Sequence, residues 1–317
     1  MKFFCTKYFR IFLLLMLTVS TSVADVAPSE LLSLGRMNDA VSLLNKRDDA
    51  ESLNLLSRAY YAMEQWDDAV RYGERAVSLQ PGSSNYHLWL AREYGRKAAD
   101  ANPLAAAGLA RKAKAEFERA VQLDGANVPA RVDLAQYYTE APAIMGGGFD
   151  KAWDQAARVE TYDAGMSHLI LARIAEKQKQ YSDAETQYRL AIKLGKNPAD
   201  MWLQLAGFYR ERGRTNDAQN AVQQAVAQSH KPAETYFDAA RELVLANRDF
   251  ADASHYLQTY LSSGALVESA PAFRAHYLLG ELNEKQGHGA AAASEYQASL
   301  SLASGFAPAR KALDRVQ

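Results

Sequence analysis

An alanine recurs along this chain at intervals near 36 residues, and this recurrence limits the chain to a fold made of repeated units. Segments such as "NDAVSLL", "DDAVRYGERAVSLQP", "AKAEFERAVQLDG" and "SDAETQYRLAIKLG" each contain this alanine, followed by apolar residues at spacings that suit one face of a helix. Eight such residues span 252 positions in seven intervals, a mean of 36. They are Ala40, Ala69, Ala113, Ala152, Ala184, Ala218, Ala253 and Ala292.

A second helical pattern lies upstream of these alanines. Leu53, Leu56, Ser57 and Tyr60 recur at i, i+3, i+4 and i+7, so they share one helical face. The same face returns as Leu90, Ala91 and Tyr94, as Leu134, Ala135 and Tyr138, as Trp202, Leu205, Ala206 and Tyr209, and as Leu279 and Gly280. The small residue in each set lets a partner helix approach closely. The two patterns together therefore predict that each unit consists of two packed helices.

These residues resemble the tetratricopeptide repeat, whose pattern spaces an aromatic residue or Leu, then Leu, a small residue, Tyr, Ala, an aromatic residue, Ala and Pro across 34 residues. The unit from Ala50 supplies Leu53, Leu56, Ser57, Tyr60, Ala69, Ala76 and Pro81, and the unit from Ala199 supplies Trp202, Leu205, Ala206, Tyr209, Ala218 and Ala225. The first of these units departs at Gly73, where an aromatic residue is usual.

The resemblance implies an all-α, right-handed superhelical solenoid of seven helix pairs, with a partial leading pair and a closing helix. The expected units are 27–46 (the partial pair), 50–83, 84–127, 128–164, 165–198, 199–233, 234–272 and 273–306, followed by a closing helix at 307–316. The function that the resemblance implies is that of a non-enzymatic scaffold, which binds another protein or a peptide through its concave groove.

The first 24 residues have the features of a secretory signal peptide. Lys2, Lys7 and Arg10 form a basic start, Ile11 to Val19 is an uncharged apolar core, and Ser22-Val23-Ala24 offers small residues for cleavage. The apolar run is short for a membrane span, although a retained anchor is the competing interpretation. We therefore expect residues 25–317 to be exported, into the periplasm or the medium.

Removal of residues 1–24 changes the net charge from −1 to −4, because three basic residues leave and no acidic ones do. This balance argues against binding nucleic acid through bulk charge. The only cysteine, Cys5, leaves as well, so packing rather than disulfides must stabilise the mature chain. No later stretch is apolar for long enough to predict a membrane span.

The glycine run in "APAIMGGGFDKAW" lies where the unit from Val128 exceeds 34 residues by five. We expect Pro142 to end one helix, Gly146, Gly147 and Gly148 to form the turn, and Lys151-Ala152 to start the next helix. A phosphate-binding loop is the alternative, but the lysine and hydroxyl that the Walker pattern requires directly after a glycine are missing.

The segment around 138–152 also resembles the inter-helix loop of the tetratricopeptide component of periplasmic TRAP transporters. This likeness implies a second class of function, a small-ligand-binding component that works with a transporter, and predicts a closed, apolar pocket near Ala141 to Trp153. A further extension, between Tyr94 and Ala113, is expected to lengthen two helices around Asn102-Pro103. It serves either as a tolerated surface insertion or as a projecting contact.

No motif for catalysis, a cofactor or a metal is found in the sequence. The six histidines have no ligand spacing, and there is no GxSxG motif and no cysteine after residue 24. His87, His168 and His276 fall on the core-facing aromatic position of the first helix and are expected to be half-buried packing residues. We therefore expect no enzyme activity and no cofactor.

The remaining candidate site is the concave groove that such solenoids form from the first helix of each pair. The resemblance places partner-binding positions at Asn54, Arg58, Tyr61, Arg92, Arg96, Arg173 and Lys177 in the early units, and at the acidic Asp238, Glu242, Glu281 and Glu284 in the late units. Arginine can grip a carboxylate through two hydrogen bonds, so a peptide terminus or an acidic segment is the expected partner. The alternative is that these charges only solvate the groove.

Overall fold

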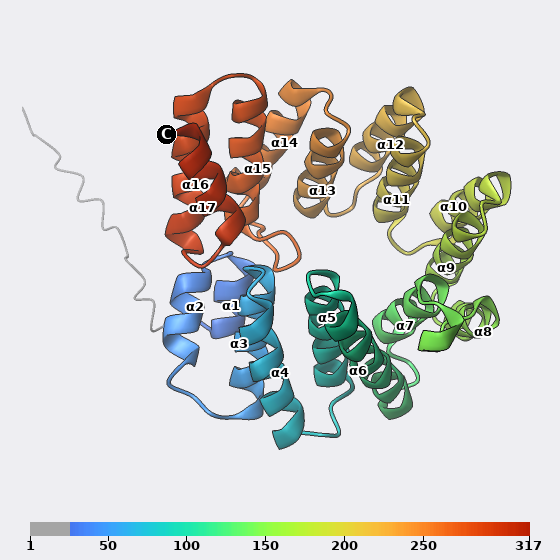
Figure 1. Ribbon diagram of the computed structural model, residues 1–317. Coiled ribbons are helices and arrows are strands. Elements are labelled where there is room, and N and C mark those ends of the chain that lie inside the picture. The colour runs from blue at the N-terminus through green and yellow to red at the C-terminus, as the bar shows by residue number, and fades with distance from the viewer. Residues whose placement is uncertain (1–25) are drawn as a thin grey trace, which may run out of the picture.

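The structure, a computed structural model, describes residues 26–317, so the expected signal peptide and Cys5 lie outside the described residues. The described part contains seventeen α-helices and no strand beyond an isolated bridge between Val267 and Ala270 (Figure 1). The first half comprises α1 (Pro28–Ser33), α2 (Met37–Leu44), α3 (Ala50–Ala62), α4 (Trp66–Leu79), α5 (Ser84–Ala99), α6 (Pro103–Leu123), α7 (Val128–Glu140), the 3-10 helix η2 (Ala143–Met145) and α8 (Phe149–Glu160). The second half comprises α9 (Ala164–Lys177), α10 (Tyr181–Leu194), α11 (Pro198–Glu211), α12 (Thr215–Ala227), α13 (Pro232–Leu245), α14 (Phe250–Ser262), α15 (Ala272–Lys285), α16 (Gly289–Leu302) and α17 (Ala307–Val316).

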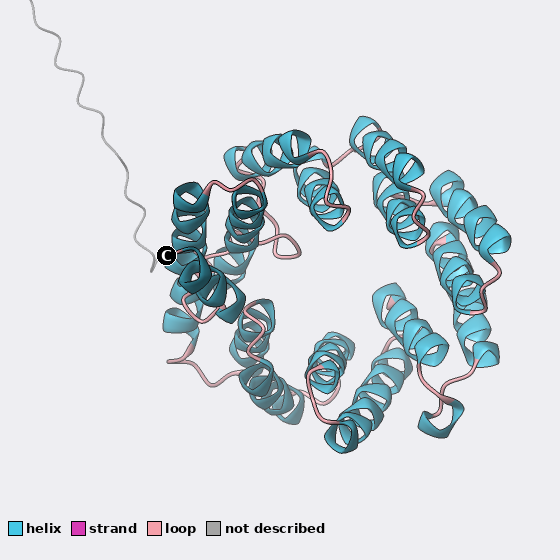
Figure 2. Ribbon diagram, turned by 45° about the horizontal axis from the view of Figure 1, so that its top comes forward, coloured by secondary structure: helices cyan, strands magenta, loops and turns pink. Residues whose placement is uncertain are grey.

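The helices pack in consecutive pairs, each made of a helix A and the helix B that follows it in the chain. From α3/α4 to α15/α16, helix A lines the inside of a curved array and helix B covers its outside (Figures 1 and 2). The pair α1/α2 precedes this array and α17 follows it. The all-α solenoid expected from the sequence is confirmed.

The repeated small residues lie where two helices come closest. All eight alanines of the repeat are at most 5% exposed. On the helix A face, Leu53, Leu90, Leu134, Leu205 and Leu279 are at most 4% exposed. The 3.6-residue period of the sequence therefore marks the faces that the helices bury against each other.

The extension between Tyr94 and Ala113 lengthens α5 and α6, which are 16 and 21 residues long. Asn102 caps α6, because its side chain accepts a hydrogen bond from the amide of Ala105, and Pro103 occupies the first turn, where no amide donor is needed.

Gly73 departs from the family pattern because another side chain fills the space that an aromatic ring would take. A Cβ atom at this position would lie 2.1 Å from Oε2 of Glu93 on α5. Glu93 is fully buried, and neither of its carboxyl oxygens has a hydrogen-bond partner. An acidic group is thus buried where the first full pair packs against the second.

The array closes on itself, so its first and last helices are neighbours and the molecule is a ring (Figure 2). One apolar core joins the two ends: Leu31, Met37 and Leu56 from the beginning of the chain pack with residues from its end, among them Phe273 and Phe306. In a linear solenoid each terminal unit exposes one apolar side to water. Here the two terminal surfaces bury each other.

Polar contacts fix the register of this closure. Asn38 donates to the carbonyl of Ser301 and accepts hydrogen bonds from the amide and the hydroxyl of Ser304. The turn between α1 and α2 lies against the start of α15, where a Cβ atom on Gly35 would be 2.4 Å from the amide nitrogen of Ala272. Gly35 also has a φ of +71°, so glycine meets both a steric and a conformational demand.

Candidate functional site

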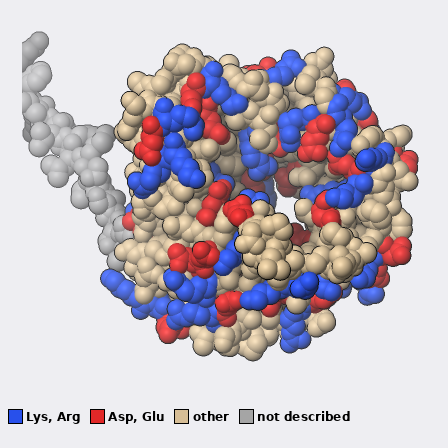
Figure 3. All heavy atoms as spheres, viewed as in Figure 1, with Lys and Arg blue, Asp and Glu red and all other residues tan. Residues whose placement is uncertain are grey.

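The inner surface of the ring, which we call the lumen, is the candidate site. An opening passes through the middle of the molecule, and both Lys/Arg and Asp/Glu atoms reach its rim (Figure 3). Two pockets hollow the lumen wall. Arg241 of α13 lines both of them, so they are neighbouring parts of one surface.

The first of these, the closure pocket, lies where the two ends of the chain meet and has a volume of about 500 Å³. It is lined by residues of α3, α4, α5, α13, α15 and the loop before α15: Arg58, Tyr61, Ala62, Trp66, Trp89, Arg92, Arg96, Phe237, Arg241, Glu268, Ser269, Pro271, Arg274, Tyr277 and Leu278. Five of these side chains are arginines and only one is acidic, so the pocket has an excess of positive charge.

Aromatic rings hold the arginines of the closure pocket in place. The ring of Trp89 carries the guanidinium of Arg58 at 5.0 Å and that of Arg92 at 4.9 Å from its centroid. Trp66 carries Arg96 at 5.3 Å, and Tyr61 contacts the edges of both tryptophans. Cation–π contacts of this kind orient a guanidinium without neutralising its charge.

Four of the five arginines in the closure pocket have an acidic partner. Arg58 donates hydrogen bonds to both carboxylate oxygens of Glu268, and its Nε lies 2.8 Å from Oε1. Arg92 bonds to Asp133 at 2.6 Å, Arg241 to Asp238 at 3.1 Å, and Arg274 to Glu64 at 3.1 Å.

Arg96 is the exception, because it forms no ion pair with any residue in the range 26–317. Burial lowers the pKa of Arg274, a direction that Glu64 opposes. Burial also raises the pKa of Asp238 to about 6, despite the nearby Arg241. The positive charge of the pocket is therefore only partly compensated.

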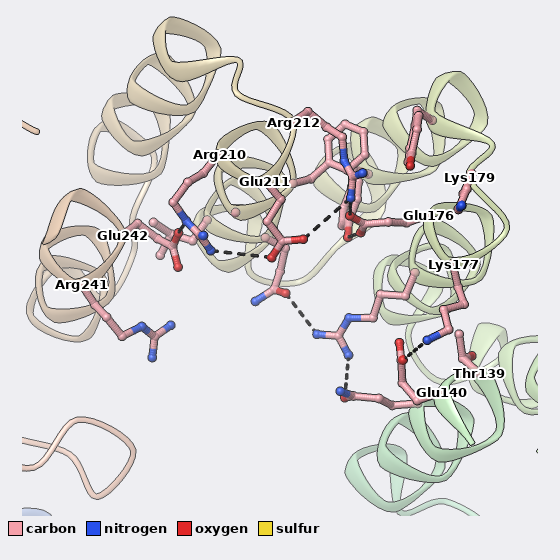
Figure 4. A pocket seen from close by; sticks show the side chains of 18 residues that line it. Thr139, Glu140, Glu176, Lys177, Lys179, Arg210, Glu211, Arg212, Arg241 and Glu242 are labelled. Atoms are coloured by element: carbon pink, nitrogen blue, oxygen red, sulfur yellow. Dashed lines mark hydrogen bonds and ion pairs between the residues drawn. The ribbon is translucent and has the colours of Figure 1, made fainter. Parts of the chain in front are cut away.

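The second pocket, the wall pocket, has a volume of about 490 Å³ and is lined by residues of α7, α9, α10, α11 and α13 and of the turns after α9 and α11 (Figure 4). Its charged side chains lie on successive helices: Glu140, Arg173, Glu176, Lys177, Lys179, Arg210, Glu211, Arg212, Arg241 and Glu242. Neighbouring helices pair these charges, as in Arg212–Glu176 at 2.9 Å and Arg210–Glu242 at 3.2 Å. Four acidic residues thus line the wall pocket beside its six cations, whereas Glu268 is the one acidic residue that lines the closure pocket.

The structure places most of the residues predicted to bind a partner in the lumen. Arg58, Tyr61, Arg92 and Arg96 line the closure pocket, while Arg173 and Lys177 line the wall pocket. Arg173 donates to the side-chain oxygens of Gln136 and Gln204, and Lys177 pairs with Glu140.

Two residues expected in the groove do not reach it. Asn54 is buried, with 4% of its surface exposed, and its amide nitrogen has no hydrogen-bond partner. Glu284 instead pairs with Arg315 of α17 at 2.6 Å and accepts a hydrogen bond from Tyr296 of α16, so the closing helix neutralises it.

Four residues of the closure pocket were not predicted from the sequence: Trp66, Trp89, Arg274 and Glu268. The first two have no fixed place in the repeat pattern, and the last two reach the pocket only because the ring closes. One signal was available for Glu268: the anchors Ala253 and Ala292 are 39 residues apart, so the connection between them is longer than usual.

The glycine loop forms the turn between α7 and α8, although α8 begins at Phe149 and not at Lys151 as expected, because Gly148 already acts as its N-cap. The amides of Gly146, Gly147 and Gly148 donate to the carbonyls of Ala143, Pro142 and Tyr138. Since these donors are used inside the loop, they do not point at a ligand as the amides of a phosphate-binding loop do. Lys151 also bonds within the loop, to the carbonyl of Gly146 at 2.9 Å.

Three histidines at equivalent positions of helix A bond to helix B of their own pair. His168 Nδ1 lies 2.7 Å from Oε1 of Gln187 and His276 Nδ1 lies 2.8 Å from Oε2 of Glu295, while the more deeply buried His87 pairs with Glu116. Each contact joins the two helices of a unit. Residues 26–317 contain no group of three or more His, Cys, Asp or Glu side chains arranged to hold a metal ion.

None of the helices in the described range is both long enough and apolar enough to span a bilayer.

Comparison with known proteins identifies the repeat. The profile of the tetratricopeptide repeat matches residues 50–83, 151–200 and 237–308. A comparison with curated proteins found no match.

Several solved structures are similar to this chain. A thermophilic TPR protein of Thermus thermophilus is 19% identical, with 57% of this chain and 98% of that chain covered and a TM-score of 0.47. PilW, described as a widely conserved type IV pilus biogenesis factor, is 18% identical over 74% of this chain and 97% of its own, with a TM-score of 0.43. A tetratricopeptide repeat protein of Parabacteroides merdae is 14% identical over 84% and 98%, also with a TM-score of 0.43.

Proposed function

Because the chain belongs to the tetratricopeptide repeat family, whose members generally mediate protein–protein interaction, we propose that it is an exported, non-enzymatic scaffold that holds a segment of another protein in its lumen. The segment is extended and acidic, or ends in a free carboxylate. Export is part of this proposal and rests on the N-terminal sequence.

The closure pocket is the observation that carries the proposal. Five arginines converge there on a surface of aromatic rings, and Glu268 is the one acidic residue that lines the pocket. Asp133, Asp238 and Glu64 pair with three of these arginines from outside the lining. Arginine is the side chain best suited to hold a carboxylate, since its planar group donates two parallel hydrogen bonds. Tryptophan and arginine are also the residues most often found at the energetic centres of protein interfaces.

The shape of the site limits the kind of partner. The lumen is enclosed by helix A of every pair, so a folded domain would have to insert a protruding segment to touch the arginines (Figure 2). An extended chain needs the least room and exposes side chains on both sides of its backbone. The charged wall pocket next to the closure pocket offers further donors and acceptors along the same path.

A crosslinked pull-down tests the proposal with one charge reversal. Arg96→Glu is the informative change, because Arg96 has no ion-pair partner in residues 26–317 and its reversal breaks no internal salt bridge. Arg119→Glu on the exposed face of α6 is the matched control, since it changes net charge equally outside the lumen.

We expect a protein partner captured by the wild type and by Arg119→Glu to be lost with Arg96→Glu. A partner retained by both variants would place the contact outside the lumen and overturn the proposal. Capture of no protein, together with a small molecule bound in native mass spectrometry, would favour the transporter-associated function.

That alternative predicted a closed apolar pocket near Ala141 to Trp153. No residue of 141–153 lines the wall pocket or the closure pocket, and the residues of α7 that line the wall pocket are polar: Gln136, Thr139 and Glu140. This arrangement supports the scaffold over the small-ligand carrier. N-terminal sequencing of the exported protein tests the localisation: a first residue of Asp25 agrees with a cleaved signal peptide, and retention of Met1 would indicate an anchor.

A further inference from the structure

The closure pocket already contains a carboxylate, and that carboxylate belongs to the protein itself. Glu268 lies in the loop between α14 and α15, residues 263–271, which projects into the opening of the ring (Figure 2). From this loop its side chain reaches across the closure to Arg58 of α3, 210 positions earlier in the chain. We infer that Glu268 occupies the position on Arg58 that a carboxylate of the partner would take. An acidic peptide must therefore displace Glu268 from Arg58 in order to bind.

The loop that carries Glu268 is built to present it. The amide of Ala270 donates to the carbonyl of Val267 at 3.1 Å, so residues 267–270 form a tight turn with Glu268 and Ser269 at its tip. The hydroxyl of Tyr260 holds both ends of this turn, because it accepts from the amide of Val267 at 3.0 Å and donates to the carbonyl of Ala270.

Tyr260 is fully buried, so the base of the turn is fixed in the core. The other connections between pairs in the second half are shorter: residues 195–197 join α10 to α11, and 228–231 join α12 to α13. The nine residues of 263–271 exceed what is needed to join two helices. The extra length delivers one acidic side chain to the lumen.

The contact has the form expected of a ligand contact. Arg58 meets both oxygens of Glu268, the two-pronged geometry in which arginine holds a carboxylate. The guanidinium is also stacked on Trp89, which it shares with Arg92. Both partners keep about a quarter of their side-chain surface exposed, 24% for Arg58 and 21% for Glu268, so an incoming group can reach the pair.

The pair is not the main bond that closes the ring. The apolar core around Phe273 and Phe306 and the hydrogen bonds of Asn38 join the same two ends. Glu268 can therefore leave Arg58 while the ring stays closed. The form in which Glu268 has left Arg58 is the one that can bind the peptide. Because only a fraction of the molecules has this form, the observed affinity is reduced by that fraction.

This inference rests on the proposed function, and one titration tests the two separately. The probe is fluorescein-labelled hexaglutamate with a free carboxyl terminus, and hexaglutamine is the uncharged comparison; binding is followed by fluorescence anisotropy. The informative variant is Glu268→Gln, which keeps the shape of the side chain and removes its charge. Asn38→Ala is the matched control, because it weakens the same closure without altering the pocket.

We expect Glu268→Gln to bind hexaglutamate on the order of tenfold more tightly than the wild type, with no gain for hexaglutamine. Asn38→Ala should match the wild type within about twofold. Adding Arg58→Gln to Glu268→Gln should abolish the gain, since the vacated guanidinium is then missing.

Three outcomes would overturn the inference. Equal binding by the wild type and Glu268→Gln would show that Glu268 does not compete, while leaving the lumen as the binding site. An equal gain with Asn38→Ala would mean that loosening the ring, rather than vacating Arg58, admits the peptide. If no variant binds hexaglutamate, the proposed function fails together with the inference.

Discussion

Replacing Glu93 with glutamine tests whether one buried acid makes this protein less stable as the pH rises. Glu93 is fully buried between α3, α4 and α5, and both of its carboxyl oxygens lack a hydrogen-bond partner. Burial raises the pKa of Glu93 to about 8 from an ordinary value of 4.5, and the nearby Ser57 hydroxyl only partly opposes this. The side chain is therefore neutral in the folded protein at neutral pH.

Proton binding determines whether the free energy of unfolding rises or falls with pH. Between pH 4.5 and about 8 the folded protein keeps a proton that the unfolded chain releases, so the free energy of unfolding falls as the pH rises. Each pH unit in this window removes about 1.4 kcal/mol of stability, hence about 3 kcal/mol by pH 7 and about 4 kcal/mol by pH 8. Glu93→Gln has no proton to lose, so it should lack this decline.

Hydrogen exchange of peptides from α3, α4 and α5 is the suitable assay, because repeat arrays can unfold unit by unit. After correction for intrinsic exchange, the stability difference between Glu93→Gln and the wild type should grow by about 3 kcal/mol from pH 4.5 to pH 7. Other titrating groups, such as Asp238, cancel in this difference. The exposed Glu51→Gln should show no such trend. Parallel pH profiles for the wild type and Glu93→Gln would refute the reasoning.

Three further substitutions test the packing. Gly280→Ala should lower stability by roughly 1–3 kcal/mol in chemical denaturation, since its Cβ would lie 2.3 Å from the ring of Tyr296; an unchanged midpoint would contradict this contact. Gly147→Ala should destabilise the α7–α8 turn by about 1–3 kcal/mol, because its Cβ would lie 1.8 Å from the carbonyl oxygen of Ala141. The same substitution should leave hexaglutamate binding unchanged. A loss of binding at full stability would give the loop a functional role. Phe306 is 1% exposed in the core that joins the two ends of the chain. Phe306→Ala should lower the free energy of unfolding by about 3–5 kcal/mol and speed hydrogen exchange in α1 and α2. Protection of α1 and α2 at the wild-type level would show that the ring does not depend on this core.

The periodic residues made the fold predictable from the sequence. A helix needs a local pattern, and Leu205, Ala206 and Tyr209 supply one face of α11 whatever the rest of the chain does. The small residue of each unit fixes how closely its two helices pack. The turn at Asn102-Pro103 also follows from local chemistry, because its cap and its proline act within a few residues.

The candidate site was predictable only in part. Arg58, Arg92 and Arg96 have repeat positions that face inward, so the sequence points to them. Asn54 has the same kind of position but is buried, which the pattern of a single unit does not reveal. Gly73 departs from the repeat for a reason that lies on another helix, in the side chain of Glu93.

By itself the sequence determined the helix pairs, their inward faces and a set of cations on the early units, because each of these depends on residues within one turn or one unit of each other. Only the tertiary structure decided that the ends meet, since small rotations between successive units add up along the whole array before α1 can reach α15. That closure brings Glu268 and Arg274 beside Arg58 and changes a groove with a basic and an acidic end into a single arginine-lined pocket.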